Sequence, residues 1–313
     1  MRTLIVGAGA MGCLFAGKMR QAGVDVTIYN RKNDHTEIIK ANGLELIEKD
    51  GTVKNIQLPV VTDPVELTAS FDLMIVLVKS FATVDVLKQV KQSITDDTIV
   101  LSLQNGLGNL EKLQQAAPNS ICCVGGTGSG ASVIENGVIA HRAFGHTYIG
   151  MPSGQQKKAH DIAALLTASG LGTSVSDDIH SVIWSKLIVN IAYNGVTAIS
   201  RLKNGDVASV REGQEIIKHL VEEAKLVADA EGITLLYDEP AAECVRMGIE
   251  DFYHNKSSML SDMINERKTE IDSINGAIVK LGSKHSLATP YNEMITHLVK
   301  LAETTYQKRV VKL

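Results

Sequence analysis

The stretch from Thr3 to Gly12 reads TLIVGAGAMG and decides the fold of the first half of the chain. Leu4, Ile5 and Val6 predict a buried strand that begins at Thr3. The three glycines fit the pattern G-x-G-x-x-G at the start of a helical pattern. In that pattern the first glycine permits a tight turn, the second lets the backbone approach a pyrophosphate, and the third lets helix and strand pack closely. The helix N-terminus adds free N–H groups and a positive dipole end. We therefore expect a dinucleotide site formed by Gly7, Gly9, Ala10, Met11 and Gly12. The alternative is a glycine-rich turn that binds no ligand.

Strand and helix patterns alternate through the rest of the first half. The strands are predicted at Thr3–Gly7, Asp25–Asn30, Leu73–Val78, Ile99–Leu103, Ser120–Val124 and Thr147–Ile149. The helices are predicted at Met11–Ala22, Asp34–Ala41, Phe81–Val90 and Leu110–Gln115. This alternation is typical of a parallel sheet covered on both faces. Leu44–Pro59 is less regular, and we expect a small β excursion there around Asp50-Gly51.

The pattern of predicted elements changes after Gly150. One more helix, Gln155–Ser169, and an edge strand, Gly172–Val175, are followed only by helical patterns. These are predicted at Ile179–Ile199, Arg211–Glu231, Pro240–Tyr253, Ser258–Leu281 and Asn292–Lys308. The predicted fold class is therefore α/β, with an N-terminal Rossmann-type doubly wound sheet followed by an all-α C-terminal domain. We place the boundary so that residues 1–177 form the dinucleotide-binding domain and residues 178–313 the helical substrate domain.

Composition excludes several classes of protein. The formal net charge is only -4, and no basic patch interleaved with aromatic residues is present, which argues against a nucleic-acid partner. The longest apolar run, Leu73–Val78, is far shorter than the ~18 residues that cross a membrane, and no signal peptide is evident. The four cysteines fit no zinc pattern, so we expect no metal and reduced thiols in a cytoplasmic protein. The oligomeric state stays open, a homodimer being one option.

The end of the second predicted strand bears on the choice of cofactor. An NAD site usually carries Asp or Glu about 20 residues past the glycines, where it holds the ribose hydroxyls. Here the strand ends in Tyr29-Asn30-Arg31-Lys32, without a carboxylate. The planar fork of Arg31 suits a 2′-phosphate, which favours NADP(H). The alternative is that Arg31 and Lys32 are solvated loop charges and that Asp34 supplies the ribose contact.

Two further strand ends carry polar residues. Lys79 follows the strand Leu73–Val78, and Asn105 follows Ile99–Leu103 after Gln104. Ligands of open α/β sheets bind outside the carboxyl ends of the strands. We therefore expect Lys79 and Asn105 to reach the nicotinamide ribose or the substrate, the alternative being ordinary loop residues.

The first helix of the second half carries a polar stripe. Lys186, Asn190 and Asn194 recur every four residues among apolar neighbours, so they share one face of a largely buried helix. Buried polar groups need partners, and a polar substrate in a wet cleft would supply them. The alternative is a ladder of hydrogen bonds between helices.

Two segments farther on are candidates for the same site. Ser257 or Ser258 is expected to cap a helix whose N-terminus could hold a substrate carboxylate. Glu270 is expected within the long helix Ser258–Leu281, shortly before Asn275-Gly276. Taken alone, Glu270 would be read as a surface charge.

Over nearly its whole length the chain resembles the ketopantoate reductase family. The resemblance lies in the glycine motif, Val78-Lys79-Ser80, Gln104-Asn105-Gly106, Lys186-x3-Asn190-x3-Asn194, Asn204-Gly205, Ser257-Ser258-Met259-Leu260 and Thr269-Glu270-Ile271-Asp272-x2-Asn275-Gly276. The glycine motif is shared by many dehydrogenases, whereas the lysine–asparagine stripe combined with the last two segments is far more specific. The sequence departs from the family at Gly125–Gly130, which is unusually rich in glycine, and at Gly195 after Asn194.

The resemblance implies an activity and a set of roles. The activity is the NADPH-dependent reduction of 2-dehydropantoate, and the alternatives are a D-2-hydroxyacid dehydrogenase of other branched or aromatic 2-oxo acids and a catalytically silent dinucleotide sensor. Lys186 resembles the general acid and Glu270 its acidic partner. The residues that resemble substrate ligands are Asn105, Asn190, Asn194, Asn204 and Ser258. Besides the glycine turn, Arg31, Lys79 and Asn105 resemble cofactor ligands.

Overall fold

The computed structural model describes residues 1–308, and the chain folds into two compact units. The first unit comprises Met1–Gln104 and Asn109–Ile179. The second comprises the short segment Asn105–Gly108 and everything from His180 onward. Each unit has its own core and is described by itself.

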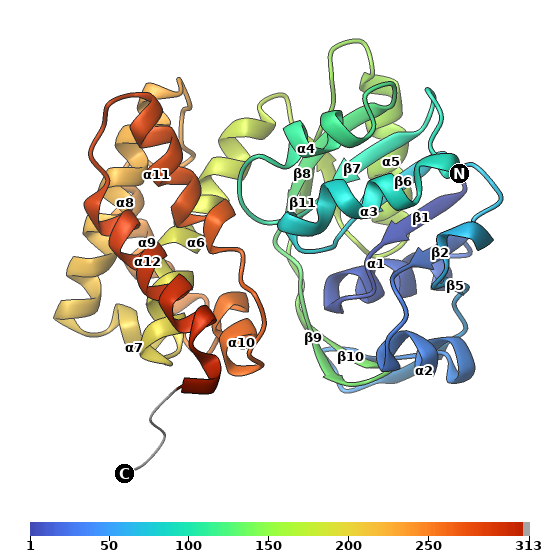
Figure 1. Cartoon of the computed structure of the whole chain (residues 1–313), viewed down its shortest axis with the longest axis horizontal. Coiled ribbons are helices and arrows are strands. Elements are labelled where there is room, and N and C mark those ends of the chain that lie inside the picture. Colours follow the sequence, from blue (N-terminus) through green and yellow to red (C-terminus); the bar gives the residue numbers. More distant parts are fainter. Residues whose placement is uncertain (309–313) are drawn as a thin grey trace. The chain divides into compact units, whose positions relative to one another are not determined.

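An eight-stranded sheet with the order β12-β11-β8-β7-β6-β1-β2-β5 forms the first unit (Figure 1). Its strands are β1 (Thr3–Val6), β2 (Val26–Tyr29), β5 (Val60–Val61), β6 (Leu73–Val76), β7 (Ile99–Ser102), β8 (Ile121–Thr127), β11 (Thr147–Gly150) and β12 (Thr173–Val175). The predicted Rossmann-type sheet is confirmed from β5 to β8, where all pairs are parallel. The expectation of a wholly parallel sheet is wrong at the other edge, because β11 pairs antiparallel with β8. The chain reaches β11 through a β-hairpin rather than through the helical crossover that a parallel neighbour requires.

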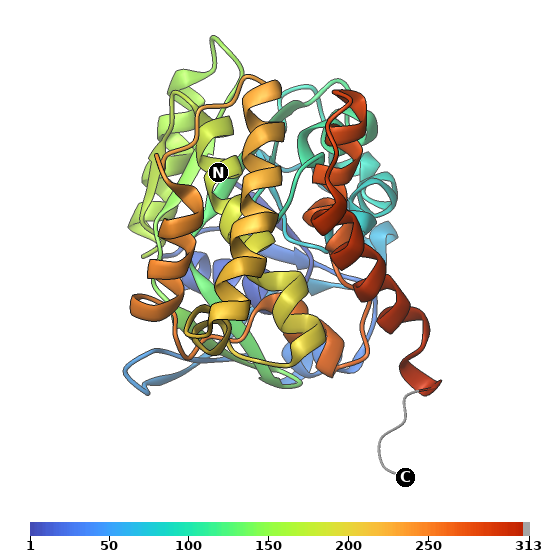
Figure 2. The same ribbon diagram turned by 90° about the vertical axis from the view of Figure 1, so that its left-hand side faces the viewer.

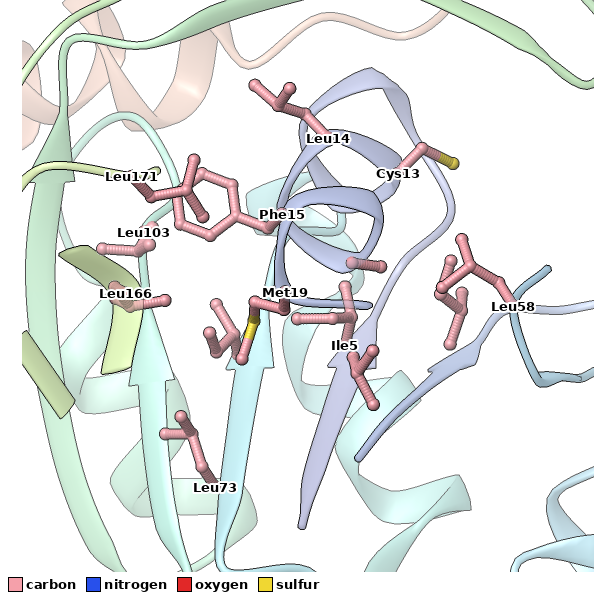
Figure 3. Close-up of a cluster of buried hydrophobic side chains, with 14 of the residues drawn as sticks. Ile5, Cys13, Leu14, Phe15, Met19, Leu58, Leu73, Leu103, Leu166 and Leu171 are labelled. Atoms are coloured by element: carbon pink, nitrogen blue, oxygen red, sulfur yellow. The ribbon is translucent and has the colours of Figure 1, made fainter. Parts of the chain in front are cut away.

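Alternate residues of the central strands face two separate cores, as the period of two in a strand demands. Leu4 and Val6 pack on one face with residues of α3 (Thr83–Gln89) and α4 (Asn109–Ala116). Ile5 packs on the other face, against α1 (Ala10–Gln21) and α5 (Gln156–Ala168). Figure 3 shows this second core, in which Phe15 and Met19 of α1 lie over the strands. Helices therefore cover both faces, as predicted.

A second, four-stranded sheet with the order β4-β3-β10-β9 belongs to the same unit. The predicted β excursion is confirmed, since β3 (Leu44–Ile47) and β4 (Val53–Ile56) pair antiparallel around Gly51. Its other half, β9 (Gly130–Glu135) and β10 (Val138–Ala143), was not predicted from the sequence. α2 (Asp34–Asn42) begins with Asn33 and Thr36 in a reciprocal capping arrangement.

The second unit is all helical, as Figure 2 shows from the side. Its helices are α6 (Ile179–Ser200), α7 (Asn204–Ala208), α8 (Arg211–Ala230), α9 (Pro240–Glu250), α10 (Ser258–Ile264), α11 (Asn275–Lys284) and α12 (Pro290–Thr304). α6 is long and apolar enough to span a membrane, but 67% of its apolar window is buried inside the structure, as expected for a core helix. The all-helical prediction holds, except that α7 was not predicted and that one predicted long helix is wrong, as described next.

The long helix predicted over Ser258–Leu281 does not exist. α10 ends at Ile264, and the chain passes through Glu266 in the left-handed region, with φ 51°, before a 3-10 turn at Ile271–Ser273. The left-handed residue interrupts the helical hydrogen bonds, so α11 starts again only at Asn275. Glu270 thus lies on a turn and not inside a helix.

Candidate functional site

The glycine turn of the first unit admits no side chain at its first and third glycines. Gly7 has φ 112°, and a Cβ atom there would lie 2.9 Å from the Val78 side chain. A Cβ atom on Gly12 would lie 1.8 Å from the carbonyl oxygen of Gly7. The turn and the first turn of α1 are therefore packed directly on each other, which only glycine allows.

The second glycine faces open space instead. Gly9 precedes α1 as its N-cap, no side chain caps this helix, and its first turn holds no acidic residue. A Cβ atom on Gly9 would meet no atom within 4 Å. Gly9 is exposed and Ala10 and Met11 are half-buried, so this end of α1 can take a phosphate group. The residues present thus fit the pyrophosphate of a dinucleotide.

Asn30 connects this turn to Arg31. The Asn30 side chain accepts a hydrogen bond from the Ala8 N–H (3.2 Å) and donates one to the Arg31 carbonyl oxygen (2.7 Å). The Arg31 side chain is exposed and forms no ion pair with any of residues 1–308, whereas Lys32 lies 3.5 Å from Glu37. The Arg31 guanidinium is thus available to an anion. Sequence reasoning did not foresee the bracing role of Asn30.

The ends of strands β6 and β7 are held together by Gln104. Its side-chain amide donates to the Val78 carbonyl oxygen (2.7 Å), and its carbonyl oxygen accepts from the Ser102 hydroxyl (2.8 Å). Lys79, half-buried, follows Val78 immediately and opens a 3-10 turn. Because Val78 also packs on Gly7, Lys79 lies at the same edge of the sheet as the glycine turn.

Lys186 and Asn105 meet in the second unit. The Lys186 ammonium donates a hydrogen bond of 2.8 Å to the Asn105 side-chain oxygen. The two residues are 81 positions apart, and α6 and the segment Asn105–Gly108 bring them together. The sequence predicts Asn105 at the end of a strand in the first half. In the structure it belongs to the helical unit.

The Asn105 segment is held in place by the 3-10 turn that follows Glu270. The Leu107 N–H donates to the Ser273 carbonyl oxygen (2.9 Å). Gly106 has φ 84°, and a Cβ atom there would lie 2.3 Å from that same oxygen. The segment therefore needs glycine at position 106, and its backbone is fixed to the turn that carries Glu270.

Glu270 is buried at the start of this turn, and its carboxylate attracts the Lys186 ammonium. Burial lowers the pKa of Lys186 to about 8, and the charge of Glu270 opposes part of that shift. A lysine with this pKa exchanges its proton near neutral pH, which suits a general acid. The structure thus groups Asn105, Lys186 and Glu270 in one cluster.

The two asparagines of the stripe lack internal partners. The half-buried Asn190 side chain forms no hydrogen bond with any part of the chain that the structure describes. Asn194 is buried, and its side-chain N–H₂ group also finds no acceptor there. The helix–helix ladder considered as the alternative is therefore absent for these two side chains among the described residues.

Ser257 and Ser258 have different surroundings. Ser257 is the N-cap of α10: its hydroxyl accepts from the Leu260 N–H (2.9 Å) and is hydrogen-bonded to Thr197 (2.7 Å). Ser258 is exposed in the first turn of that helix. Asn204, buried at the start of α7, has a side-chain oxygen without a hydrogen-bond donor among the described residues. Ser257 is thus occupied by structural hydrogen bonds, while Ser258 and Asn204 keep polar atoms available.

A buried hydrogen-bond network that the sequence did not suggest joins α8, α11 and α12. The Asn275 side chain donates to the Asn292 side-chain oxygen (3.0 Å), and Asn292 donates to the buried Glu223 carboxylate (2.7 Å). Glu223 also accepts the Tyr291 and Asn292 N–H groups and so caps α12. Asn275 lies in the quoted family segment, but nothing in the sequence pointed to Glu223.

Comparisons with known proteins agree along the whole chain. Residues 3–154 match the family model described as ketopantoate reductase PanE/ApbA, and residues 178–303 match its C-terminal model. Curated relatives named 2-dehydropantoate 2-reductase include those of Halobacterium salinarum, 32% identical over 97% of this chain and 99% of the relative, and Pyrococcus horikoshii, 35% identical over 97% and 98%.

Similar solved structures include a ternary complex of D-mandelate dehydrogenase with NADH and anilino(oxo)acetate, with a TM-score of 0.92 and 30% identity over 98% of this chain and all of the other. Another is a ketopantoate reductase from Ralstonia eutropha, with a TM-score of 0.90 and 29% identity over 98% of this chain and 100% of the other. The glycine turn, the lysine–asparagine stripe and these matches lead to one conclusion: the chain belongs to the ketopantoate reductase PanE/ApbA family of oxidoreductases.

Proposed function

We propose that this protein reduces 2-dehydropantoate to (R)-pantoate with NADPH, as a cytoplasmic enzyme of pantothenate and coenzyme A synthesis. The observation that carries the proposal is the cluster of Lys186, Asn105 and Glu270, in which a lysine with a lowered pKa is hydrogen-bonded and faces a buried carboxylate. The names of the full-length relatives support the choice of substrate. We further propose residues 1–177 as the cofactor domain and 178–313 as the substrate domain.

Support for NADPH comes from the end of β2. Position 30 carries an uncharged amide, which is already committed to Ala8 and Arg31. A 2′-phosphate would therefore meet no carboxylate there and could pair with the free Arg31 guanidinium. The exposed N-terminus of α1 would hold the pyrophosphate, and Lys79 would contact the nicotinamide ribose at the neighbouring strand end.

Lys186 supplies the proton in this proposal. A nicotinamide cofactor, when bound, would supply the hydride for C2 of the 2-oxo acid. As negative charge grows on the substrate's carbonyl oxygen, the Lys186 ammonium stabilises it and then transfers a proton to it, leaving a neutral amine and the 2-hydroxy acid. The pKa of about 8 keeps most of the lysine protonated at neutral pH while making that proton easy to release.

Asn105 and Glu270 keep Lys186 ready for this step. The Asn105 oxygen accepts one ammonium N–H and so orients the amine. The Glu270 carboxylate favours the charged form of Lys186 and so opposes part of the lowering of its pKa by burial. Removal of Glu270 should therefore lower the pKa of Lys186 further and leave less of the acid form at neutral pH.

The open polar groups of the second unit would bind the rest of the substrate. Asn190 and Asn194 offer amides without internal partners for its carbonyl and hydroxyl oxygens. Ser258 would contact the carboxylate with its exposed hydroxyl, and the Asn204 side-chain oxygen would accept a hydrogen bond from a substrate hydroxyl. Binding would thus satisfy amides that the free protein leaves unsatisfied.

A second candidate is a D-2-hydroxyacid dehydrogenase that acts on other branched or aromatic 2-oxo acids. The observation that favours it is the likeness to D-mandelate dehydrogenase, whose structures contain NADH. Both candidates use the same Lys186 cluster, so they differ in substrate side chain and in cofactor.

The test is a panel of initial rates with 2-dehydropantoate and 2-oxoisocaproate, each with NADPH and NADH. We expect the highest kcat/KM with 2-dehydropantoate and NADPH. Arg31→Ala should raise the KM for NADPH by about 10- to 100-fold and leave that for NADH unchanged, since it removes charge-assisted hydrogen bonds to a phosphate. Lys32→Ala is the matched control. Faster turnover of 2-oxoisocaproate with NADH would reject the proposal in favour of the second candidate.

A further inference from the structure

Three of the proposed substrate ligands of the second unit are held by one short segment of the chain. The segment comprises residues 253–258 and leads from α9 into α10; we call it the linking segment. Ser258 is its last residue, and Asn204 and Asn194 lie on helices that are hydrogen-bonded to it. The positions of all three ligands thus depend on how this segment is fixed.

The start of α7 is bound to the linking segment through its backbone. The Asn204 N–H donates to the Asn255 carbonyl oxygen (3.1 Å), and the Gly205 N–H donates to the Tyr253 carbonyl oxygen (3.0 Å). A Cβ atom on Gly205 would lie 2.3 Å from the Tyr253 ring, so the two stretches touch at a point where only glycine fits. Asn204 is therefore fixed relative to the linking segment.

Ser257 connects the linking segment to α6. Its hydroxyl oxygen is 2.7 Å from that of Thr197, a residue 60 positions away in the sequence. Thr197 is fully buried, and Ser257 is only 7% exposed. Because burial of a hydroxyl is unfavourable unless it is hydrogen-bonded, the contact between these two groups stabilises the packing of α10 on α6.

The partners of the two hydroxyls determine where their protons lie. Ser257, the N-cap of α10, accepts the Leu260 N–H (2.9 Å), and Thr197 is the other partner of its hydroxyl in the part of the chain that the structure describes. Ser257 therefore donates its own proton to Thr197. Thr197 in turn donates to the Tyr193 carbonyl oxygen (2.8 Å), with the Asn194 carbonyl oxygen 3.3 Å away. One directed chain of hydrogen bonds thus runs from the cap of α10 into the turn of α6 that carries Asn194.

We infer that Thr197 is a positioning residue for substrate binding: through Ser257 it holds the Ser258 hydroxyl where that hydroxyl meets the substrate carboxylate. Ser258 follows Ser257 directly, so any movement of the cap moves Ser258 as well. Neither Thr197 nor Ser257 has to touch the substrate, because each commits its proton within the protein. The inference rests on the proposed role of Ser258 toward a 2-oxo acid. The alternative is a pair of hydroxyls that stabilises α10 and has no effect on the substrate.

Thr197→Val tests the inference, because valine keeps the branched shape and removes only the hydroxyl. Ser257 then loses the acceptor for its proton. The KM for the 2-oxo acid should rise about 3- to 10-fold, the factor expected for one lost hydrogen bond, and kcat should change by less than about twofold. Lys186, the proposed acid, lies about three helical turns before Thr197, so proton transfer should be unaffected. A wild-type KM in Thr197→Val would overturn the inference.

Two further variants separate the hydroxyl from the general effects of a substitution in the core. Thr197→Ser retains the hydroxyl, so it should keep the wild-type KM even though it leaves a small cavity. Thr296→Val is the matched control, because Thr296 is buried on α12 and donates within its own helix to the Asn292 carbonyl oxygen (2.7 Å). It should also leave KM unchanged. A KM raised equally in all three variants would mean that the effect comes from packing, against the inference.

A double-mutant cycle asks whether Thr197 acts through Ser258. Ser258→Ala alone should raise KM, since it removes the proposed contact with the carboxylate. Adding Thr197→Val should then raise KM by less than about twofold, because no hydroxyl is left to misplace. Equal factors in the two backgrounds would refute the positioning role.

Fold and substrate are controlled separately. Each variant is first checked for the wild-type far-UV spectrum and melting behaviour, and if Thr197→Val does not fold, Ser257→Ala breaks the same bond from the α10 side and is held to the same outcomes. Rates are measured with whichever 2-oxo acid of the panel the wild type reduces faster, so rejection of 2-dehydropantoate as the substrate leaves this test intact. A wild-type chain that reduces neither acid would reject both the proposed function and this inference.

Discussion

The glycine turn of the first unit and the Lys186 cluster of the second prepare for their ligands in opposite ways. The turn is made of backbone and excludes side chains, since a Cβ atom on Gly7 or Gly12 would overlap its neighbours. The cluster is made of side chains, and it leaves amides such as Asn194 buried without partners. Ligand binding at the glycine turn depends on the shape of the backbone. Ligand binding at the cluster depends on buried polar groups that lower the stability of the free protein. Substitutions should therefore fail for different reasons in the two regions.

Loss of the Lys186 ammonium should have the largest effect. Lys186→Ala removes both the proton donor and the positive charge opposite the developing oxyanion, so kcat should fall by ~10³-fold or more. The dissociation constant for NADPH, measured by fluorescence titration, should stay within about twofold, because the glycine turn is untouched. Lys280→Ala, at an exposed lysine of α11, is the control. Near-normal turnover would remove Lys186 from the role of acid.

The two kinds of glycine give the next contrast. Gly12→Ala should weaken NADPH binding by ~100-fold or destabilise the first unit, because the new methyl group would lie 1.8 Å from the Gly7 carbonyl oxygen. Gly9→Ala meets no protein atom and should keep the wild-type melting temperature, whereas NADPH binding should weaken because the new methyl group occupies the space through which the backbone approaches the pyrophosphate. Equal effects of the two substitutions on stability would contradict the packing described here.

The pH profile sharpens the account of the polar cluster. The acid form of Lys186 is required for reduction, so kcat/KM should be flat below about pH 7 and fall as pH rises through about 8. Glu270 raises that pKa by its charge, so Glu270→Gln should move the fall to lower pH. Asp272→Asn, at an exposed carboxylate of the same turn, should leave the profile unchanged. A profile that shifts to higher pH in Glu270→Gln would show that the carboxylate acts in another way.

The smallest expected effect is a change in stability on removal of the unpartnered Asn194 amide. Asn194→Leu has a similar shape and removes the unpaired N–H₂ group, so the free enzyme should become more stable by about 1–2 kcal/mol. The same change should raise the KM for substrate. Chemical denaturation and initial rates measure the two quantities. A variant that is less stable than the wild type would mean that the Asn194 amide already has a partner, such as a buried water.

The features that the sequence predicted well depend on local pattern. The parallel core of the sheet, the glycine turn and the stripe on α6 follow from period and spacing, and the structure contains all three. The break between α10 and α11 depends on Glu266 adopting a left-handed conformation, which no composition rule requires of a glutamate. The long apolar pattern across it was therefore read as one helix.

The site residues that were predicted also follow from local pattern, and those that were missed depend on distant contacts. Asn105 and Lys186 were chosen from a strand end and a helix face, and the structure joins them by a hydrogen bond. Asn30 and Glu223 are not predicted from the sequence, because each accepts a hydrogen bond from a backbone N–H group that is distant in the sequence. Ser257 and Ser258 could not be told apart, since capping depends on the exact residue at which α10 starts.

The path of the chain between the two units restricts how chimeras of this protein could be made. The four residues Asn105–Gly108 belong to the helical unit, although long stretches of the other unit precede and follow them. A gene fragment cut near residue 178 would encode helices without the loop that orients the ammonium and hydrogen-bonds to Ser273. A hybrid made from the first half of one relative and the second half of another would therefore combine the helices of one protein with the Asn105–Gly108 loop of the other. Functional chimeras should require that these four codons travel with the distal half.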